Sequence, residues 1–261
     1  MIPVNYIDMA NERLSHACNR MNELMLTCNQ YLESEPIHIE REMFDLDDLP
    51  CVRFRFRVSA HPPQRVGLLA GEVVHQLRAT LDNLVWALGQ VYPSPNSKAK
   101  NERLAFPVAA TEQTFEKMLT EPNYVGILDF PVAARSAIAD AQSFKRLPDG
   151  PNLEVLHRLW NADKHKVPSI FLTHSSGITQ DLDLRQPALI SVGEIADGTV
   201  FCEGAIPPQG IADGASPRLT SLAFGLRDPL LNANYAFQPL LYGHIQLVSL
   251  VLKTLTPILR T

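Results

Sequence analysis

Two short segments concentrate the residue types that transfer protons, bind metals or recognise phosphate. The first begins at Gly71 and reads GEVVHQLRATLDN, and the second begins at Leu153 and reads LEVLHRLWNADKHK. Each contains a glutamate, a histidine three residues later, and then an arginine and an aspartate. Apolar residues recur every three or four positions in both segments, which predicts two amphipathic helices. We expect the polar residues of each segment to lie together on one face of its helix.

The first segment lies in a helix predicted from about residue 63 to residue 91. A helical projection at 100° per residue separates its valines and leucines from its polar residues. Arg78 and Asp82 are four residues apart on the polar side and are expected to pair, with His75 beside them. Trp86 also lies on that side, and an exposed tryptophan is uncommon. We therefore predict that this face contacts another element or another chain.

The second segment lies in a helix predicted from about residue 152 to residue 166, which Pro168 ends. Its polar residues fall within a narrow arc: Glu154, His157, Arg158, Asn161 and His165. Asp163 would point to the apolar side of this helix. A buried carboxylate needs a cation, and Arg78 is the expected partner.

The spacing of Arg158 and His165 resembles the Arg-x(4–6)-His signature of HEPN-domain nucleases, which are small helical bundles of bacterial defence and toxin systems. The resemblance covers one motif and the predicted bundle at about 63–166. It departs from the family at Leu159, where a polar residue is usual. It implies a homodimer whose motifs meet at the interface and an endoribonuclease that needs no metal or other cofactor.

The resemblance also implies roles for individual residues. Arg158 would hold phosphate through its guanidinium fork. His165 would transfer protons in the reaction of the 2′-hydroxyl, and Asn161 would orient both groups. From their positions on the two helices, and not from the resemblance, we expect Arg78, Asp82, Asp163 and His75 to be supporting residues. The patterns Leu-Arg-x-x-Leu-Asp at Leu77 and Asn-x-Asp-Lys-His at Asn161 also resemble a group of uncharacterised bacterial proteins, which implies no activity.

Two other interpretations stay open. In the first, the protein is a non-enzymatic interaction or structural protein, and its polar clusters only pack helices against each other. In the second, two Glu-x-x-His steps supply a di-metal site of the kind found in carboxylate-bridged bundles. Its ligands would be Glu72, His75, Glu154 and His157, and two further glutamates are required, for which Glu23 and Glu116 are available.

A length of 261 residues fits one large or two small domains, and the predicted elements favour a single α+β domain. The composition predicts a soluble globular protein, and the cysteine pattern predicts a cytoplasmic one. A net charge of -5 argues against a broad nucleic-acid-binding surface, and no DNA-binding motif is present. Four cysteines without a C-x-x-C pair argue against a zinc ribbon or a disulfide framework. Polar residues interrupt the apolar run at 239–259, which favours a core helix over a membrane span.

The expected fold is a HEPN-like helical bundle with an antiparallel β-sheet packed to one side. The helical part comprises about 8–33, 63–166 and 237–259, and the β part about 36–59 and 169–228. Alternation at 37–44 and 51–58 predicts a hairpin in one register, which pairs His38 with Arg57, Glu40 with Arg55 and Glu42 with Arg53. On the first helix, the predicted inward seam is Leu14, Cys18, Met21, Met25, Cys28 and Leu32.

Overall fold

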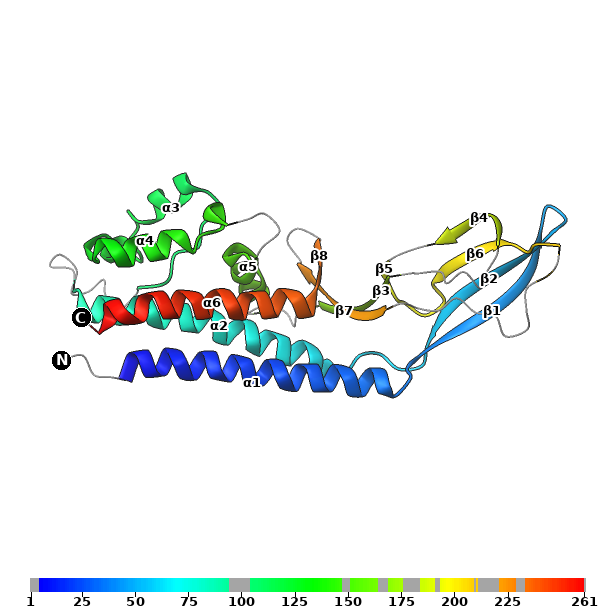
Figure 1. The fold of residues 1–261 in the computed structure, drawn as a ribbon, viewed down its shortest axis with the longest axis horizontal. Coiled ribbons are helices and arrows are strands. Elements are labelled where there is room, and N and C mark those ends of the chain that lie inside the picture. The colour runs from blue at the N-terminus through cyan, green and yellow to red at the C-terminus, as the bar shows by residue number, and fades with distance from the viewer. Residues whose placement is uncertain are drawn as a thin grey trace.

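The structure is a computed structural model that describes residues 5–93, 104–146, 151–163, 169–175, 184–190, 193–208, 210, 221–228 and 233–260. The described part is elongated, with the helices gathered at one end and the strands at the other (Figure 1). The chain is α+β, as the sequence predicts. It contains two antiparallel sheets rather than the single sheet expected.

The three long helices are α1 (Asn5–Glu33), α2 (Gln64–Val91) and α6 (Phe237–Leu259). They lie side by side along the long axis of the molecule, and α1 and α6 both contact α2 (Figure 1). Shorter helices cover this group: α3 (Glu112–Met118), η2 (Val125–Asp129), α4 (Val132–Asp140), η3 (Ser143–Lys145) and α5 (Leu153–Asp163). The helices predicted at about 8–33, 63–91 and 237–259 therefore form, and the helix predicted from about residue 152 forms as far as Asp163, where the described stretch ends.

The far sheet has the strand order β1-β2-β6-β4, and the near sheet has the order β5-β3-β7-β8. The strands of the far sheet are β1 (Ile37–Leu46), β2 (Leu49–Val58), β6 (Val200–Ala205) and β4 (Arg185–Ile190). Those of the near sheet are β5 (Gly193–Glu194), β3 (Ser169–Ser175), β7 (Ser221–Asp228) and β8 (Ala233–Ala236). The near sheet contacts the helices through β7, β3 and β8, and the far sheet extends beyond it (Figure 1).

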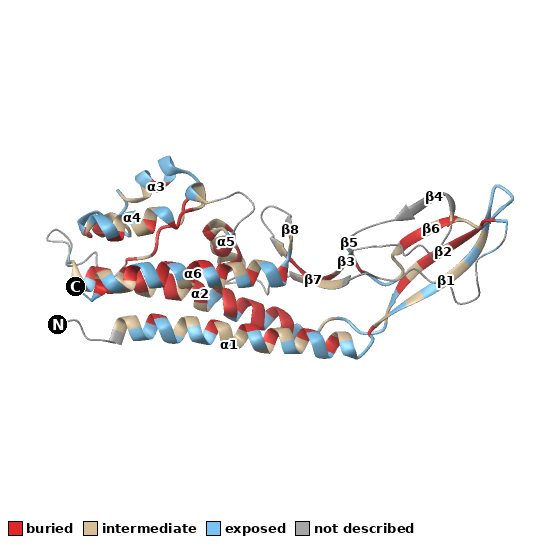
Figure 2. Cartoon of the chain, in the orientation of Figure 1, coloured by how far each residue is buried: buried red, intermediate tan, exposed pale blue. Residues whose placement is uncertain are grey.

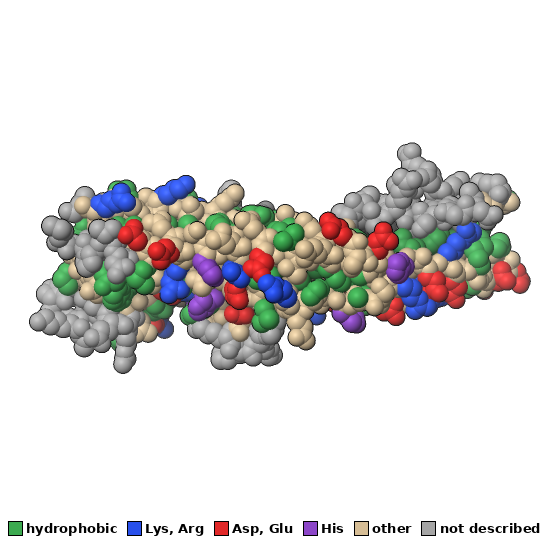
Figure 3. Space-filling view, turned by 90° about the horizontal axis from the view of Figure 1, so that it is seen from below, with side chains coloured by type: hydrophobic (Ala, Val, Ile, Leu, Met, Phe, Trp, Pro, Cys, Tyr) green, Lys and Arg blue, Asp and Glu red, His purple; other side chains and the backbone are tan. Residues whose placement is uncertain are grey.

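The hairpin of β1 and β2 has the register that alternation predicts. His38 pairs with Arg57, Glu40 with Arg55 and Glu42 with Arg53. The shortest ion pairs join residues that are diagonal neighbours across the two strands. Glu40 binds Arg57 at 2.8 Å, and Glu42 binds Arg55. Acidic and basic side chains therefore adjoin along this end of the molecule (Figure 3). The three arginines of β2, Arg53, Arg55 and Arg57, are each paired with a carboxylate.

The inward seam of α1 differs from the prediction. The buried side chains are Ala10, Ala17, Met21, Leu24, Cys28 and Tyr31, whereas Leu14, Cys18, Met25 and Leu32 are only partly buried. Two alanines lie in this seam. The most apolar stripe of the sequence is therefore not the most buried one.

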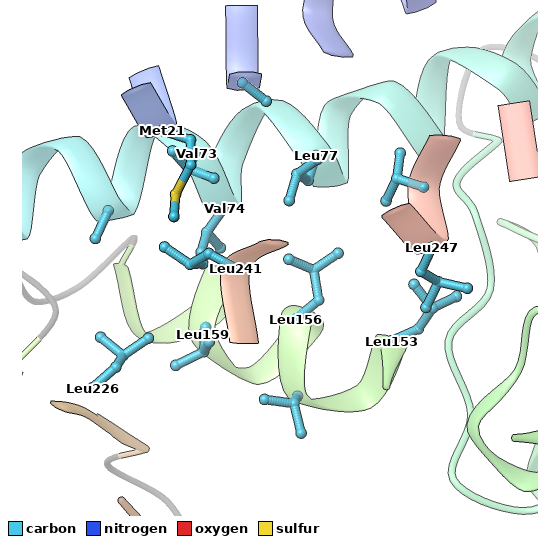
Figure 4. Close-up of a cluster of buried hydrophobic side chains, with 14 of the residues drawn as sticks. Met21, Val73, Val74, Leu77, Leu153, Leu156, Leu159, Leu226, Leu241 and Leu247 are labelled. Carbon is cyan, nitrogen blue, oxygen red and sulfur yellow. The ribbon is translucent and has the colours of Figure 1, made fainter. Parts of the chain in front are cut away.

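The core of the helical part is centred on α2, which is buried along most of its length (Figure 2). Leucines of α5 and α6 point toward α2 in Figure 4, where Leu156 and Leu159 lie beside Leu77 and Val74. The contacts of α2 with α1, α5 and α6 explain this burial. Within the described residues, no helix is both long and apolar enough to cross a bilayer.

Candidate functional site

Arg78 of α2 is almost completely buried, with 3% of its surface exposed. Its Nη2 donates to the carbonyl oxygen of Phe106 at 2.7 Å and lies 2.9 Å from Oδ1 of Asp82. Oδ1 of Asp82 in turn accepts from the backbone N–H of Phe106 at 2.8 Å. The predicted Arg78–Asp82 pair therefore forms, and it holds the backbone of Phe106 at both its N–H and its carbonyl group.

The surroundings of Arg78 explain its electrostatics. Burial lowers the pKa of the guanidinium below its ordinary value, while Asp82 and Tyr124 act in the opposite direction. Nε and Nη1 are buried and have no hydrogen-bond partner among the described residues. The ring of Trp160 on α5 lies 5.4 Å from the guanidinium carbon, a distance suited to a cation–π contact. This environment is typical of a residue that fixes packing.

Asp163, at the end of α5, lies against Gly71 rather than being held by Arg78. A β-carbon at Gly71 would lie 2.9 Å from Cγ of Asp163 and closer still to Oδ1. Burial raises the pKa of this carboxyl group, and the charge of His75 opposes that rise. The expectation that Arg78 holds Asp163 is therefore wrong. Arg78 forms its ion pair with Asp82 on the same helix. The charge that opposes the raised pKa of Asp163 belongs to the exposed His75.

The polar arc of α5 is organised by contacts within the helix. Arg158 lies 2.5 Å from Oε1 of Glu154, and its side chain is 14% exposed. Nδ2 of Asn161 lies 3.0 Å from Nε2 of His157. Both pairs join residues four apart, so the α-helix itself sets their geometry. His165, the remaining member of the predicted arc, lies outside the described residues, as do Lys164 and Lys166.

The N-terminus of α5 is anchored by residues that sequence patterns did not single out. Oδ1 of Asn152 accepts from the N–H of Glu154 at 2.8 Å and from the hydroxyl of Ser143 at 2.5 Å. Nε2 of His244, a fully buried residue of α6, donates to the carbonyl oxygen of Asn152 at 2.8 Å. Asn152 is separated from His244 by 92 positions. Only the asparagine, a common helix N-cap, offered a sequence signal for this contact.

Trp86 contacts another element, as its position on the polar face of α2 predicts. The ring of Trp86 meets Tyr6 of α1 edge-on, with 4.3 Å between the ring centroids. This part of the polar face of α2 therefore contacts α1 of the same chain.

The two Glu-x-x-His steps do not form a metal site. Among the described residues, no group of three or more histidine, cysteine, aspartate or glutamate side chains is placed to hold a metal ion. Glu72 faces Arg20 of α1 at 3.7 Å, Glu154 pairs with Arg158, and Glu23 pairs with Arg20 and Arg65. These carboxylates bind cations of the protein, so the di-metal interpretation of Glu72, His75, Glu154 and His157 is wrong for this structure.

Comparison with known proteins adds no relative: no family model, curated protein or solved structure matches the chain. The arrangement divides the two clusters into a packing part, formed by Arg78 and Asp82, and a part on α5 that faces away from its buried leucines. The second part contains an arginine, an amide and an imidazole, which can bind an anion and exchange a proton.

Proposed function

We propose that the protein cleaves RNA without a metal ion, in the manner of HEPN-type nucleases, through the polar arc of α5. The observation that supports this is the division of α5 into two faces. Leu156 and Leu159 are buried toward α2, whereas Arg158 and Asn161 lie on the opposite side. Arg158 pairs with Glu154 and Asn161 lies beside His157, so both polar groups are held on this side of the helix.

In this proposal each residue of the arc has one role. Arg158 binds a phosphate oxygen pair of the RNA backbone through its guanidinium fork. His165 removes the proton from a 2′-hydroxyl group, whose oxygen attacks the neighbouring phosphorus and forms a 2′,3′-cyclic phosphate. The P–O5′ bond breaks, and the protonated His165 gives its proton to the 5′-oxygen that leaves. Asn161 donates an amide hydrogen to hold the reacting groups in place. No metal ion enters these steps.

The Glu154–Arg158 pair gives the proposal a specific consequence. A phosphate must compete with the carboxylate of Glu154 for the same guanidinium. Removal of that carboxylate charge in Glu154→Gln should therefore strengthen RNA binding, whereas a purely structural pair would show only a change in stability. Binding of a fluorescent RNA oligonucleotide measures the first effect, and chemical denaturation measures the second.

The decisive experiment is cleavage of single-stranded RNA by the purified protein in the presence of EDTA. General acid–base catalysis contributes about 10² to 10⁴ in rate, so His165→Ala should lose at least about a hundredfold. His61→Ala, which changes an exposed histidine far from α5 in sequence, is the matched control and should keep the full rate. A His165→Ala protein that cleaves at the wild-type rate excludes this proposal.

The second candidate is a non-enzymatic protein in which the clusters only join helices. It is favoured by the contacts of Arg78 and Asp82, which both bind the backbone of Phe106. This candidate predicts no RNA cleavage by the wild-type protein and a loss of stability for variants of either cluster. Cleavage that disappears in His165→Ala at unchanged stability would reject it.

A further inference from the structure

Strand β1 lies at the edge of the far sheet, whose order is β1-β2-β6-β4. Among the described residues, no strand pairs with its outer side. The N–H of Ser59 donates to the carbonyl oxygen of Pro36 at 2.8 Å, which makes these two residues a hydrogen-bonded pair just before β1 begins. Such pairs alternate along an antiparallel ladder. Ile39, Arg41, Met43 and Asp45 therefore direct their backbone N–H and carbonyl groups outward.

Two of these outward positions carry opposite charges without a partner. Within the described part of the chain, neither Arg41 nor Asp45 makes an ion pair, and the buried Nε of Arg41 has no hydrogen-bond partner. Glu40 and Glu42 on the other face of the same strand are both paired. Met43 lies between the unpaired charges and is 54% exposed, although Val52 opposite it on β2 is fully buried.

We propose that two copies of this chain associate through their β1 strands, which pair antiparallel about a two-fold axis at Met43. The two four-stranded sheets then become one continuous sheet. In this register Arg41 of each copy is opposite Asp45 of the other, so the two-fold axis produces the same ion pair twice. Arg41, Met43 and Asp45, which face one another in this register, all have outward backbone groups, so the hydrogen bonds of the ladder can form.

Charge selects this register over its neighbours. A shift that centres the axis on Glu42 brings two glutamates directly opposite each other, and one centred on Arg41 does the same for two arginines. Like charges directly opposite each other destabilise a strand pair. A register centred on Phe44 moves Arg41 opposite Asp47, which lies beyond the end of β1. The Met43-centred register alone matches both unpaired charges within the strand.

The first test measures the mass of the full-length protein by analytical ultracentrifugation over a range of concentrations. Wild type should dimerise, and Arg41→Asp or Asp45→Arg should each raise the dimer dissociation constant by about tenfold or more, because each change creates two repulsive contacts. The double variant Arg41→Asp/Asp45→Arg restores opposite charges and should dimerise as wild type does. A monomeric wild type overturns the proposal. The charge of Arg41 would then serve to protect a solitary edge strand from pairing.

The second test uses cross-linking and does not depend on charge. In the proposed dimer the two Met43 Cα atoms form a hydrogen-bonded pair about 5.5 Å apart, within the roughly 4.4–6.8 Å that disulfides span. Met43→Cys in a Cys18→Ser background should therefore cross-link on mild oxidation. Leu46→Cys is equally exposed, at 54%, but its two copies would be about 20 Å apart along the strands.

The pattern of cross-links decides between interfaces. A disulfide-linked dimer from Met43→Cys and none from Leu46→Cys supports the proposal. Equal cross-linking of both variants, or a dimer whose dissociation constant is unchanged by the charge reversals, places the interface elsewhere and overturns it. This test involves no residue of α5, so its outcome is independent of RNA cleavage.

Discussion

Asp163 and Gly71 join the two polar clusters by direct contact. The carboxylate at the end of α5 lies against the bare Cα of a glycine in α2, where a β-carbon would lie 2.9 Å from Cγ of Asp163. Glycine is unfavourable inside a helix by up to about 1 kcal/mol relative to alanine. The contact with Asp163 gives a physical reason for glycine at this position.

Replacement of this glycine should destabilise the protein despite the better helix propensity of alanine. We expect Gly71→Ala to lower the free energy of unfolding by about 1–3 kcal/mol, because the new methyl group overlaps Asp163. Urea denaturation measures the change. Ala79→Gly, at a partly buried site two turns along α2, serves as the control for helix propensity alone.

A second substitution tests whether the overlap with Asp163 causes this loss of stability. Asp163→Ala should relieve the overlap, so the double variant Gly71→Ala/Asp163→Ala should be more stable than the sum of the single changes predicts, by about 1 kcal/mol or more. Strict additivity would show that the two side chains do not meet.

Loss of the Arg78 guanidinium should be more costly. Arg78→Met removes the donor to Phe106 and leaves Asp82 without its cation, so we expect a loss of about 2–4 kcal/mol in the free energy of unfolding. Arg78→Lys keeps the charge and should recover part of this loss. Equal stability of Arg78→Met and wild type would contradict the packing role assigned to this pair.

The parts of the fold that follow local rules were predictable. The β1–β2 register was predicted residue by residue, because charges and apolar residues alternate in matching positions of both strands. The seam of α1 was misplaced since Ala10 and Ala17 carry little hydrophobic signal yet are fully buried. Two short strands, β5 and β8, carry too few residues for a recognisable alternation.

Contacts between distant segments explain the errors at the site. The sequence placed Arg78 and Asp163 on suitable helix faces but could not specify how far α5 is shifted along α2. That shift brings Trp160 to Arg78 and Asp163 to Gly71. The role of Phe106 was equally unpredictable, because its backbone rather than its side chain provides the contact with Arg78 and Asp82.

The buried His244 should make stability depend on pH. Burial lowers the pKa of its imidazole below the ordinary value, although hydrogen bonds to the backbone of Asn152 and Leu240 oppose this shift. The unfolded chain therefore binds a proton near pH 6.5 while the folded chain does not. Stability contributed by neutral His244 is present above pH 6.5 and is lost as the pH falls through the lowered value.

A glutamine at this position tests the assignment. His244→Gln keeps a donor for the carbonyl oxygen of Asn152 and removes the titrating group. The variant should lose less stability than wild type between pH 7.5 and pH 5, as measured by thermal unfolding. His61→Gln, at an exposed site, should retain the wild-type slope. Identical slopes for wild type and His244→Gln would assign the acid sensitivity to other groups.

The four cysteines should differ sharply in their reaction with a thiol reagent. Cys28, Cys51 and Cys202 are buried, whereas Cys18 is partly exposed on α1. Burial also raises the pKa of Cys28 to about 12, so its reactive thiolate is scarce at pH 8. We expect one fast-reacting thiol in the native protein at pH 8 and all four in guanidinium chloride. Cys18→Ser should remove the fast phase, and a fast phase that survives this substitution would contradict the burial of Cys28, Cys51 or Cys202.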